Sequence, residues 1–120
     1  MQKLAKREEQ IMQALWHLEK AFVKEIIQEL PEPKPHYNSV ATMVRILEEK
    51  GFLDHESFGN TFRYFPLISK EAYQRQTVGD LVKQYFNDSY PSMLAFFAKE
   101  EKISKADLEE ILQLIQSKKP

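Results

Sequence analysis

Residues 38–51 read Asn-Ser-Val-Ala-Thr-Met-Val-Arg-Ile-Leu-Glu-Glu-Lys-Gly, and this stretch decides how the chain is organised. Asn38 or Ser39 is a good N-cap and Gly51 is a good helix end, so the pattern predicts a helix over about residues 39–50. At about 100° per residue, its apolar and polar side chains separate onto opposite faces. The apolar face holds Val40, Met43, Val44 and Leu47, with Ile46 at its edge, and the polar face holds Asn38, Ala41, Thr42, Arg45 and Glu49.

The neighbouring segments give this helix its context. Apolar residues spaced by three and four predict helices over residues 6–18 and 23–30, and the second helix ends at the prolines of residues 31–35. After Gly51 the period changes to two, which predicts strands over 52–58 and 61–65 around a Gly59-Asn60 turn, with Pro66 as the stop. Three helices followed by a hairpin are typical of a winged helix-turn-helix, whose third helix enters the DNA major groove. The alternative is a surface helix with one packed face.

The C-terminal part predicts three further helices. Ser69 begins one over residues 70–87, Pro91 stands at the start of the next, and Ser104 with Asp107 forms a capping box before the last. These short helices carry more large apolar side chains than they can bury among themselves, which favours a symmetric dimer over an arm folded back on its own chain. The residues expected in the dimer interface are Leu81, Tyr85, Phe86, Leu94, Phe97, Leu108, Ile111, Leu112 and Ile115.

The sequence therefore predicts a mainly α fold with a minor β component. A winged-helix DNA-binding domain is expected over residues 1–68, with the wing over 52–66. A helical dimerisation domain is expected over 69–120.

The charge balance constrains a DNA-binding function. The chain has 120 residues with 17 Lys and Arg against 18 Asp and Glu, a net charge of −1. Affinity for DNA comes largely from cations that replace counterions on phosphates, so the basic groups must cluster on one face, and a dimer would double them. The absence of cysteine excludes disulfides and thiolate metal sites. No apolar run has the length of a membrane span or signal peptide, so we expect a cytoplasmic protein.

The sequence lacks the residue sets of common enzyme sites. It contains no Ser-His-Asp or Cys-His set, and its three glycines form no phosphate-binding loop. His17, His36 and His55 show neither metal spacing nor a surrounding pattern of carboxylates. We therefore expect no enzyme, no catalytic residue, no metal site and no cofactor.

Several segments together resemble one known family. They are Glu-Gln-Ile-Met-Gln-Ala-Leu-Trp at residues 9–16, Val-Lys-Glu-Ile at 23–26, Val-Ala-Thr-Met-Val at 40–44, Leu-Glu-Glu-Lys-Gly at 47–51 and Tyr-Phe-Pro-Leu-Ile-Ser at 64–69. In this order and spacing they resemble the penicillinase-repressor (BlaI/MecI/CopY-type) regulators over nearly the whole chain. The resemblance implies a winged-helix homodimer that binds palindromic operator DNA and represses transcription.

The resemblance also implies site residues. It directs Asn38, Ser39, Thr42 and Arg45 toward the major groove and puts Asn60 and Arg63 on the wing. The chemistry agrees, because Asn and Ser at a helix start can bind phosphate, Thr can touch a thymine methyl, and Arg can bind guanine or phosphate. The family often has Arg where this chain has Ile46, so the basic residue is shifted by one position here.

The resemblance further implies a membrane sensor-transducer peptidase as a partner. In the β-lactam-responsive branch the C-terminal arm is cleaved at an Asn-Phe bond, and Phe96 occupies the Asn position here. The resemblance therefore does not imply that this chain is cleaved at that bond. Copper sensing through a cysteine-rich motif is not carried over either, because the chain has no Cys.

A second function remains open on the sequence alone. A winged-helix module that binds another protein, without sequence-specific DNA binding, would fit the nearly neutral charge. The salt dependence of binding to duplex DNA separates the two functions, because a DNA binder loses affinity steeply with salt.

Overall fold

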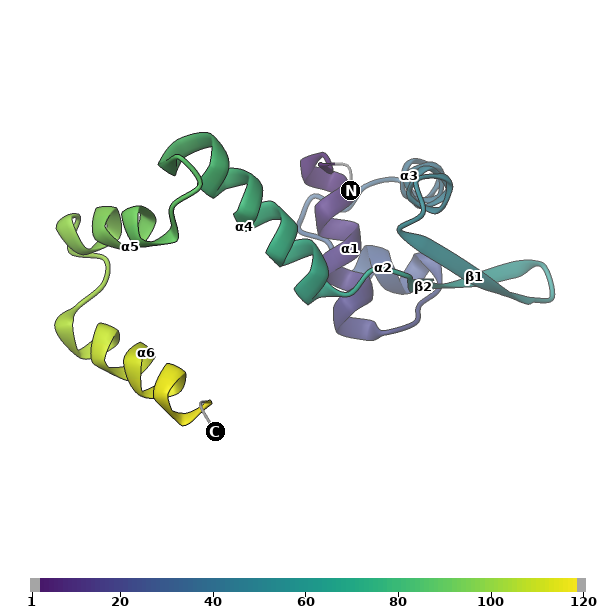
Figure 1. Ribbon diagram of the computed structural model, residues 1–120. Coiled ribbons are helices and arrows are strands. Elements are labelled where there is room, and N and C mark those ends of the chain that lie inside the picture. The colour runs from purple at the N-terminus through teal and green to yellow at the C-terminus, as the bar shows by residue number, and fades with distance from the viewer. Residues whose placement is uncertain (1–2, 119–120) are drawn as a thin grey trace. The chain divides into compact units, whose positions relative to one another are not determined.

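A computed structural model of the protein describes residues 3–118 and divides the chain into two compact units after Thr77 (Figure 1). The first unit contains α1 (Lys6–Leu18), α2 (Val23–Glu29), α3 (Tyr37–Glu49), β1 (Leu53–Phe58) and β2 (Thr61–Pro66). α4 (Lys70–Phe86) begins in this unit and continues into the second, which also contains α5 (Tyr90–Lys99) and α6 (Lys105–Ser117). The predicted winged helix-turn-helix order of three helices and a hairpin is confirmed.

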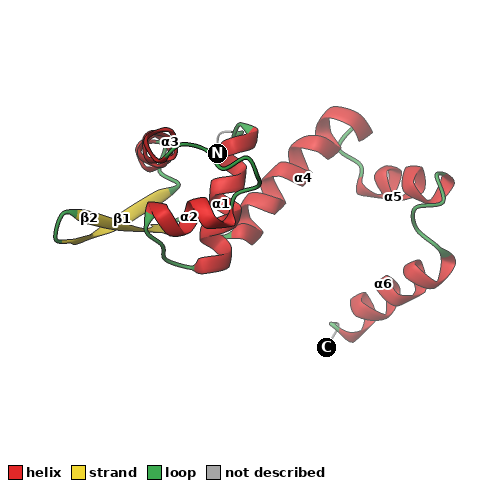
Figure 2. Ribbon diagram, turned by 180° about the vertical axis from the view of Figure 1, so that it is seen from behind, coloured by secondary structure: helices red, strands yellow, loops and turns green. Residues whose placement is uncertain are grey.

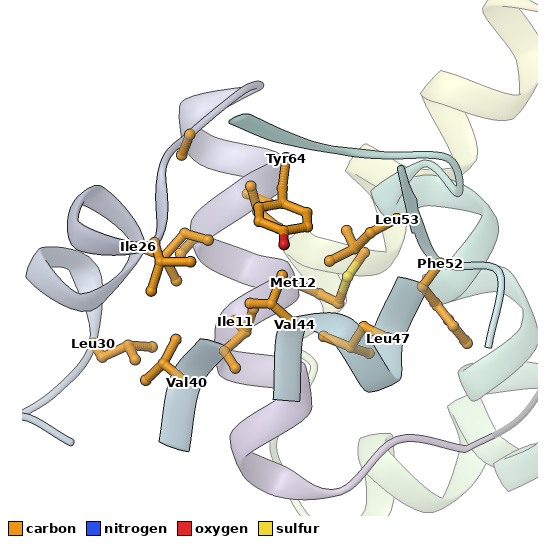
Figure 3. Close-up of a cluster of buried hydrophobic side chains, with 14 of the residues drawn as sticks. Ile11, Met12, Ile26, Leu30, Val40, Val44, Leu47, Phe52, Leu53 and Tyr64 are labelled. Atoms are coloured by element: carbon orange, nitrogen blue, oxygen red, sulfur yellow. The ribbon is translucent and has the colours of Figure 1, made fainter. Parts of the chain in front are cut away.

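The core of the first unit is built from one face of each of its helices and from the base of the hairpin (Figure 3). α3 contributes Val40, Val44 and Leu47, all fully buried, as the helical spacing predicted. They pack with side chains of the other elements that are also almost fully buried, among them Ile11, Met12, Leu15, Ile26, Leu53 and Tyr64. Burying side chains of this size contributes about 1.5–3 kcal/mol each, so the core fixes how α3 is rotated about its axis.

The start of α3 differs from the expected one. Its N-cap is His36, not Asn38 or Ser39, and no side chain caps it. His36 is still extended, with a φ of −65° and a ψ of 144°, and the helix begins at the next residue. The end of α3 follows the expectation, because Gly51 has a φ of +86° and closes a Schellman motif in which Phe52 N–H donates to Leu47 O.

Four other element ends differ by one residue, each for a local reason. α2 ends at Glu29 because Pro31 forces Leu30 into an extended conformation. β1 begins at Leu53 because Phe52 belongs to the helix end, and β2 includes Pro66, which pairs with Leu53 at the strand end where no ladder donor is needed. α4 ends at Phe86 because Asn87 and Asp88 take positive φ values of 52° and 60°.

Tyr73 ties the first half of α4 to the first unit. Its hydroxyl donates to Glu9 Oε2 at 2.7 Å and accepts from Leu4 N–H at 3.4 Å, and its ring centroid lies 5.7 Å from that of Trp16. Burial, with the bond to Glu9, raises the pKa of Tyr73 above its ordinary value. The first compact unit therefore extends into α4 as far as Thr77. The division into a DNA-binding and a dimerisation domain between residues 68 and 69 stays a prediction.

The hairpin projects from the helices of the first unit as a twisted two-stranded ribbon (Figure 2). Its strands pair antiparallel from Leu53↔Pro66 to Phe58↔Thr61, and Ala21 exchanges two backbone hydrogen bonds with Tyr64 near its base. The loop is Gly59-Asn60, as predicted, with glycine at the position whose φ is +58°. The alternation of side chains gives the hairpin two faces with different surroundings.

The second unit has a small packed centre. Val82 is fully buried, and the rings of Phe86, Phe96 and Phe97 make a chain of edge contacts with centroids 5.6 and 5.5 Å apart. The expected caps are confirmed at Ser104, which forms a capping box with Asp107, and at Ser69, which accepts from Ala72 N–H. No residue of α6 is buried, so its apolar side chains remain exposed.

Within residues 3–118, none of the helices combines the length and the apolar character that crossing a bilayer requires.

An ion pair joins α1 to the end of α3. Glu8 Oε2 accepts from Lys50 Nζ at 2.9 Å, while Glu8 Oε1 accepts from Ala5 N–H at the start of α1. The Glu8 side chain is only 12% exposed. Burial raises the pKa of Glu8, but the hydrogen bonds from Lys50 and Ala5 outweigh burial, and the pKa lies below its ordinary value of 4.5.

We predict that Glu8→Gln lowers the free energy of unfolding at neutral pH by about 1–2 kcal/mol, because it removes a charge-assisted hydrogen bond. The contribution of Glu8 is fully present above the pKa of the unfolded chain and is lost as the pH falls through the lower folded pKa. Urea unfolding of both proteins at pH 7 and at pH 3 checks this, and the gap should narrow at pH 3. An equal gap at both pH values would contradict it.

We also predict that Gly59→Ala destabilises the hairpin through backbone strain alone. A Cβ at Gly59 would meet no atom within 4 Å, but the φ of +58° disfavours any residue with a side chain. The expected loss is about 1 kcal/mol in thermal or urea unfolding. Gly59→Asn is the matched control, since Asn tolerates this conformation better, and a larger loss for Asn than for Ala would refute the explanation.

Candidate nucleic-acid interface

α3 presents a continuous polar face to solvent. Asn38, Ser39, Thr42 and Arg45 are all exposed, on the side of the helix away from Val40 and Val44. The Thr42 hydroxyl donates to the backbone oxygen of Asn38 at 2.9 Å. This bond occupies the hydroxyl hydrogen, so the methyl group and the oxygen lone pairs are what Thr42 can offer to a bound molecule.

The N-terminus of α3 has unused capacity for an anion. No side chain caps it, and its first turn contains no acidic residue. The first amide N–H groups of a helix have no partner within the helix and carry its positive dipole end. A phosphate oxygen would satisfy them, beside the exposed side chains of Asn38 and Ser39.

A groove of about 610 Å³ runs between α2, α3 and the hairpin. α3 contributes Tyr37, Ala41 and Arg45, which follow one another at intervals of four residues along one side of the helix. The hairpin contributes Asn60 at its loop and Phe62 on β2. Two of the expected site residues, Arg45 and Asn60, therefore lie on one concave surface although they come from different elements.

Arg63 lies on the other face of the hairpin. Its guanidinium donates to Glu56 Oε2 at 3.3 Å and stacks over the ring of Phe58, with 4.8 Å from Cζ to the centroid. The hydrogen bond from Lys20, with a further one from Arg63, holds the pKa of Glu56 below its ordinary value. Arg63 lines a second hollow with Lys20 and Phe65 and does not line the groove that Arg45 lines.

Three other residues that line the groove were not among the expected site residues, although Tyr37 could pack against Ala41 or reach a phosphate on the sequence alone. Lys24 is the second residue of α2, Tyr37 opens α3 and Phe62 is a half-exposed aromatic residue on β2. A basic residue in the first turn of a helix is a weak signal by itself. Only the packing of α2 against α3 and β2 brings these side chains to the same groove as Arg45.

The structure corrects the expectation that the histidines lack neighbouring carboxylates. His55 Nδ1 lies 2.7 Å from Glu48 Oε2, and His17 Nδ1 lies 3.0 Å from Glu29 Oε1. Asp54 adds a further oxygen beside His55, and one ligand atom from each of Glu48, Asp54 and His55 lies within 4.8 Å of the other two. The expectation was wrong because Glu48 is at the end of α3 and His55 is on β1, which pack together only in the fold.

The residues expected in a dimer interface are mostly exposed in the second unit. Seven of the nine are clearly exposed, namely Leu81, Tyr85, Leu94, Leu108, Ile111, Leu112 and Ile115, while Phe86 and Phe97 are partly buried. Phe96 and Leu114 are also about half exposed and were not among the expected residues. The second unit therefore carries a large apolar surface that its own helices leave uncovered.

Comparisons with known proteins agree with this architecture. The sequence profile of the family described as penicillinase repressor matches residues 4–117. The methicillin resistance regulatory protein MecI of Staphylococcus aureus (strain N315) is 22% identical over 116 residues, which are 96% of this chain and 94% of that protein. The penicillinase repressor of Bacillus licheniformis is 24% identical over 111 residues, covering 92% of this chain and 87% of that protein.

A solved structure resembles part of this chain. The solution structure of the DNA-binding domain of the repressor BlaI aligns with a TM-score of 0.51 and 28% sequence identity. The alignment covers 61% of this chain and 94% of that domain.

Proposed function

Since the chain belongs to the penicillinase repressor family of transcriptional regulators, which are not enzymes, we propose that it represses transcription as a homodimer on palindromic operator DNA. α3 enters the major groove, and the hairpin is the wing that follows the adjacent backbone. The observation that carries the proposal is the exposed polar face of α3, with Asn38, Ser39, Thr42 and Arg45 opposite a fully buried apolar face.

The roles follow from the chemistry of each group. Asn38 and Ser39 bind a phosphate together with the uncapped amides at the start of α3. Thr42 turns its methyl group toward a thymine, because its hydroxyl hydrogen is held by Asn38 O. Arg45 reads a guanine edge, or binds a phosphate, from the middle of the helix.

The loop and the strands of the wing contribute differently to DNA binding. Asn60 shares the groove with Arg45 and contacts the backbone from the loop. Arg63 contributes less than its charge suggests, because the Glu56 carboxylate is paired with it and the Phe58 ring stacks on it. Lys24 at the start of α2 is the additional phosphate contact that the groove suggests.

Dimerisation compensates for the absence of excess positive charge in a chain whose net charge is −1. A dimer doubles the number of phosphate contacts and lets two copies of α3 occupy two half-sites. The exposed apolar side chains of α4, α5 and α6 supply a surface that a second copy covers in a self-complementary interface. We place the repressor in the cytoplasm, where its operator is accessible, and a membrane sensor-transducer peptidase as its upstream partner.

We predict that Arg45→Ala weakens operator binding by about 1–3 kcal/mol and relaxes the base preference at one position of each half-site, because it removes a base contact. Arg63→Ala is the matched control, since it removes the same charge from a site where Glu56 already balances it, and should cost less. The operator is first selected from a random duplex pool, and affinities are then measured by fluorescence anisotropy at fixed salt.

The outcome of the selection decides between the two functions of a winged helix. A repressor enriches two inverted half-sites, and its affinity falls steeply as salt rises. A pool that yields no enriched sequence, together with salt-independent binding, would assign the fold to a protein-binding module. Unchanged affinity of Arg45→Ala on a selected operator would remove Arg45 from base reading and leave the repressor function intact.

We predict that the double substitution Leu112→Asp and Ile115→Asp converts the dimer to a monomer. Both side chains are 52% exposed on α6, so charges there leave the fold of one chain intact but oppose burial between two chains. Light scattering after size exclusion should give twice the chain mass for the unchanged protein and one chain mass for the variant. Glu109→Gln on the same helix is the control, and a monomeric unchanged protein at micromolar concentration would contradict the proposal.

A further inference from the structure

The end of α3 and the start of β1 bring together an imidazole and two carboxylates. His55 Nδ1 lies 2.7 Å from Glu48 Oε2, and one ligand atom each from Glu48, Asp54 and His55 lies within 4.8 Å of the other two. Glu48 and His55 are partly buried, and Asp54 is exposed. In Figure 1, α3 leads directly into β1 at this point. From this geometry we propose that Glu48, Asp54 and His55 bind a divalent transition-metal ion such as zinc, with water completing the coordination.

The chemistry of the three ligands selects this class of ion. One imidazole nitrogen with two carboxylate oxygens suits zinc and its neighbours, whereas calcium and magnesium prefer sites made only of oxygen. Ligand atoms bound to one zinc ion at about 2.0–2.2 Å lie about 3–3.5 Å from one another. The three ligand atoms lie within 4.8 Å of one another, so side-chain rotations can bring them to this spacing around one ion.

The imidazole is held in place before any metal arrives. The His55 ring packs on Phe62, with centroids 4.2 Å apart, and lies 5.7 Å from the ring of Tyr64. The Asp54 carboxylate is also positioned, because it accepts the backbone N–H of His55 at 2.8 Å. A ligand whose rotamer is fixed loses less conformational entropy when it binds, which favours metal affinity at a site of only three protein ligands.

The negative charge around the three side chains favours the binding of a cation. Among the ion pairs of residues 3–118, neither Glu48 nor Asp54 has a lysine or arginine partner. Glu48 also lies in the last turn of α3, where the helix dipole adds partial negative charge. Two carboxylates and a helix end therefore face one imidazole, and a dication compensates this excess of negative charge. A metal ion bound to these three residues would link α3 to the hairpin.

His17 provides an internal comparison. It makes a similar pair with Glu29, at 3.0 Å, but these two form no set of three potential ligands in the described part of the chain. If both were ordinary surface pairs of histidine and glutamate, substitutions at His17 and at His55 would have the same effect on zinc binding. If His55 binds a metal ion, only the substitution at His55 weakens zinc binding, and the experiment measures this difference.

The test titrates zinc chloride into the untagged full chain by isothermal calorimetry and records thermal unfolding with and without zinc. We expect one ion per chain and a melting temperature that rises with zinc and returns on addition of a chelator, because the ion binds the folded state. His55→Gln, Glu48→Gln and Asp54→Asn should each weaken binding at least about tenfold and abolish the shift. His17→Gln should bind zinc as the unchanged protein does.

The measurements overturn the proposal if the unchanged chain binds no zinc, if His55→Gln binds it equally well, or if His17→Gln weakens binding as much. Circular dichroism without zinc establishes that each variant folds. If His55→Gln or Glu48→Gln does not fold, Asp54→Asn decides, because Asp54 is exposed and its replacement leaves the core untouched. None of these readouts depends on DNA binding, so they test the metal site separately from the repressor function.

Discussion

The burial of Val40, Val44 and Leu47 against α1 is the constraint on which the rest of the first unit depends. These side chains are inaccessible to solvent, and together they determine how α3 is rotated about its axis. Once that rotation is fixed, Asn38, Thr42 and Arg45 can only point outward. The polar face is therefore a consequence of the core, and a change in the core would misdirect it without touching any of its residues.

The hairpin depends on the same core through its base. Leu53 and Tyr64 are buried in it, and Tyr64 exchanges backbone hydrogen bonds with Ala21 ahead of α2. A two-stranded ribbon is marginal alone, so these contacts hold the wing. They also set which face of the ribbon meets α3, and this places His55 beside Glu48 and turns Arg63 toward Lys20 and Glu56.

Much of this architecture could be predicted because helices and strands have fixed periods. The spacing of apolar residues gave the buried face of α3, the order of the elements and the Gly59-Asn60 turn. The order of three helices and a hairpin predicted the winged helix-turn-helix, which the structure confirms. The family resemblance is confirmed by the match over residues 4–117. The missed boundaries have local causes in proline and in left-handed residues, as at Leu30 and Asn87. The proposed roles in DNA binding and in the dimer interface remain predictions.

The sequence by itself determined which side of each element is apolar, because that property follows from residue order and backbone period alone. It could not determine which polar side chains meet across elements. Lys20 with Glu56, which are 36 residues apart, and Glu48 with His55, on α3 and β1, are such pairs. Tyr73 reaches Glu9 across 64 residues. Only tertiary packing decided these contacts, because each depends on how whole elements are positioned against a shared core.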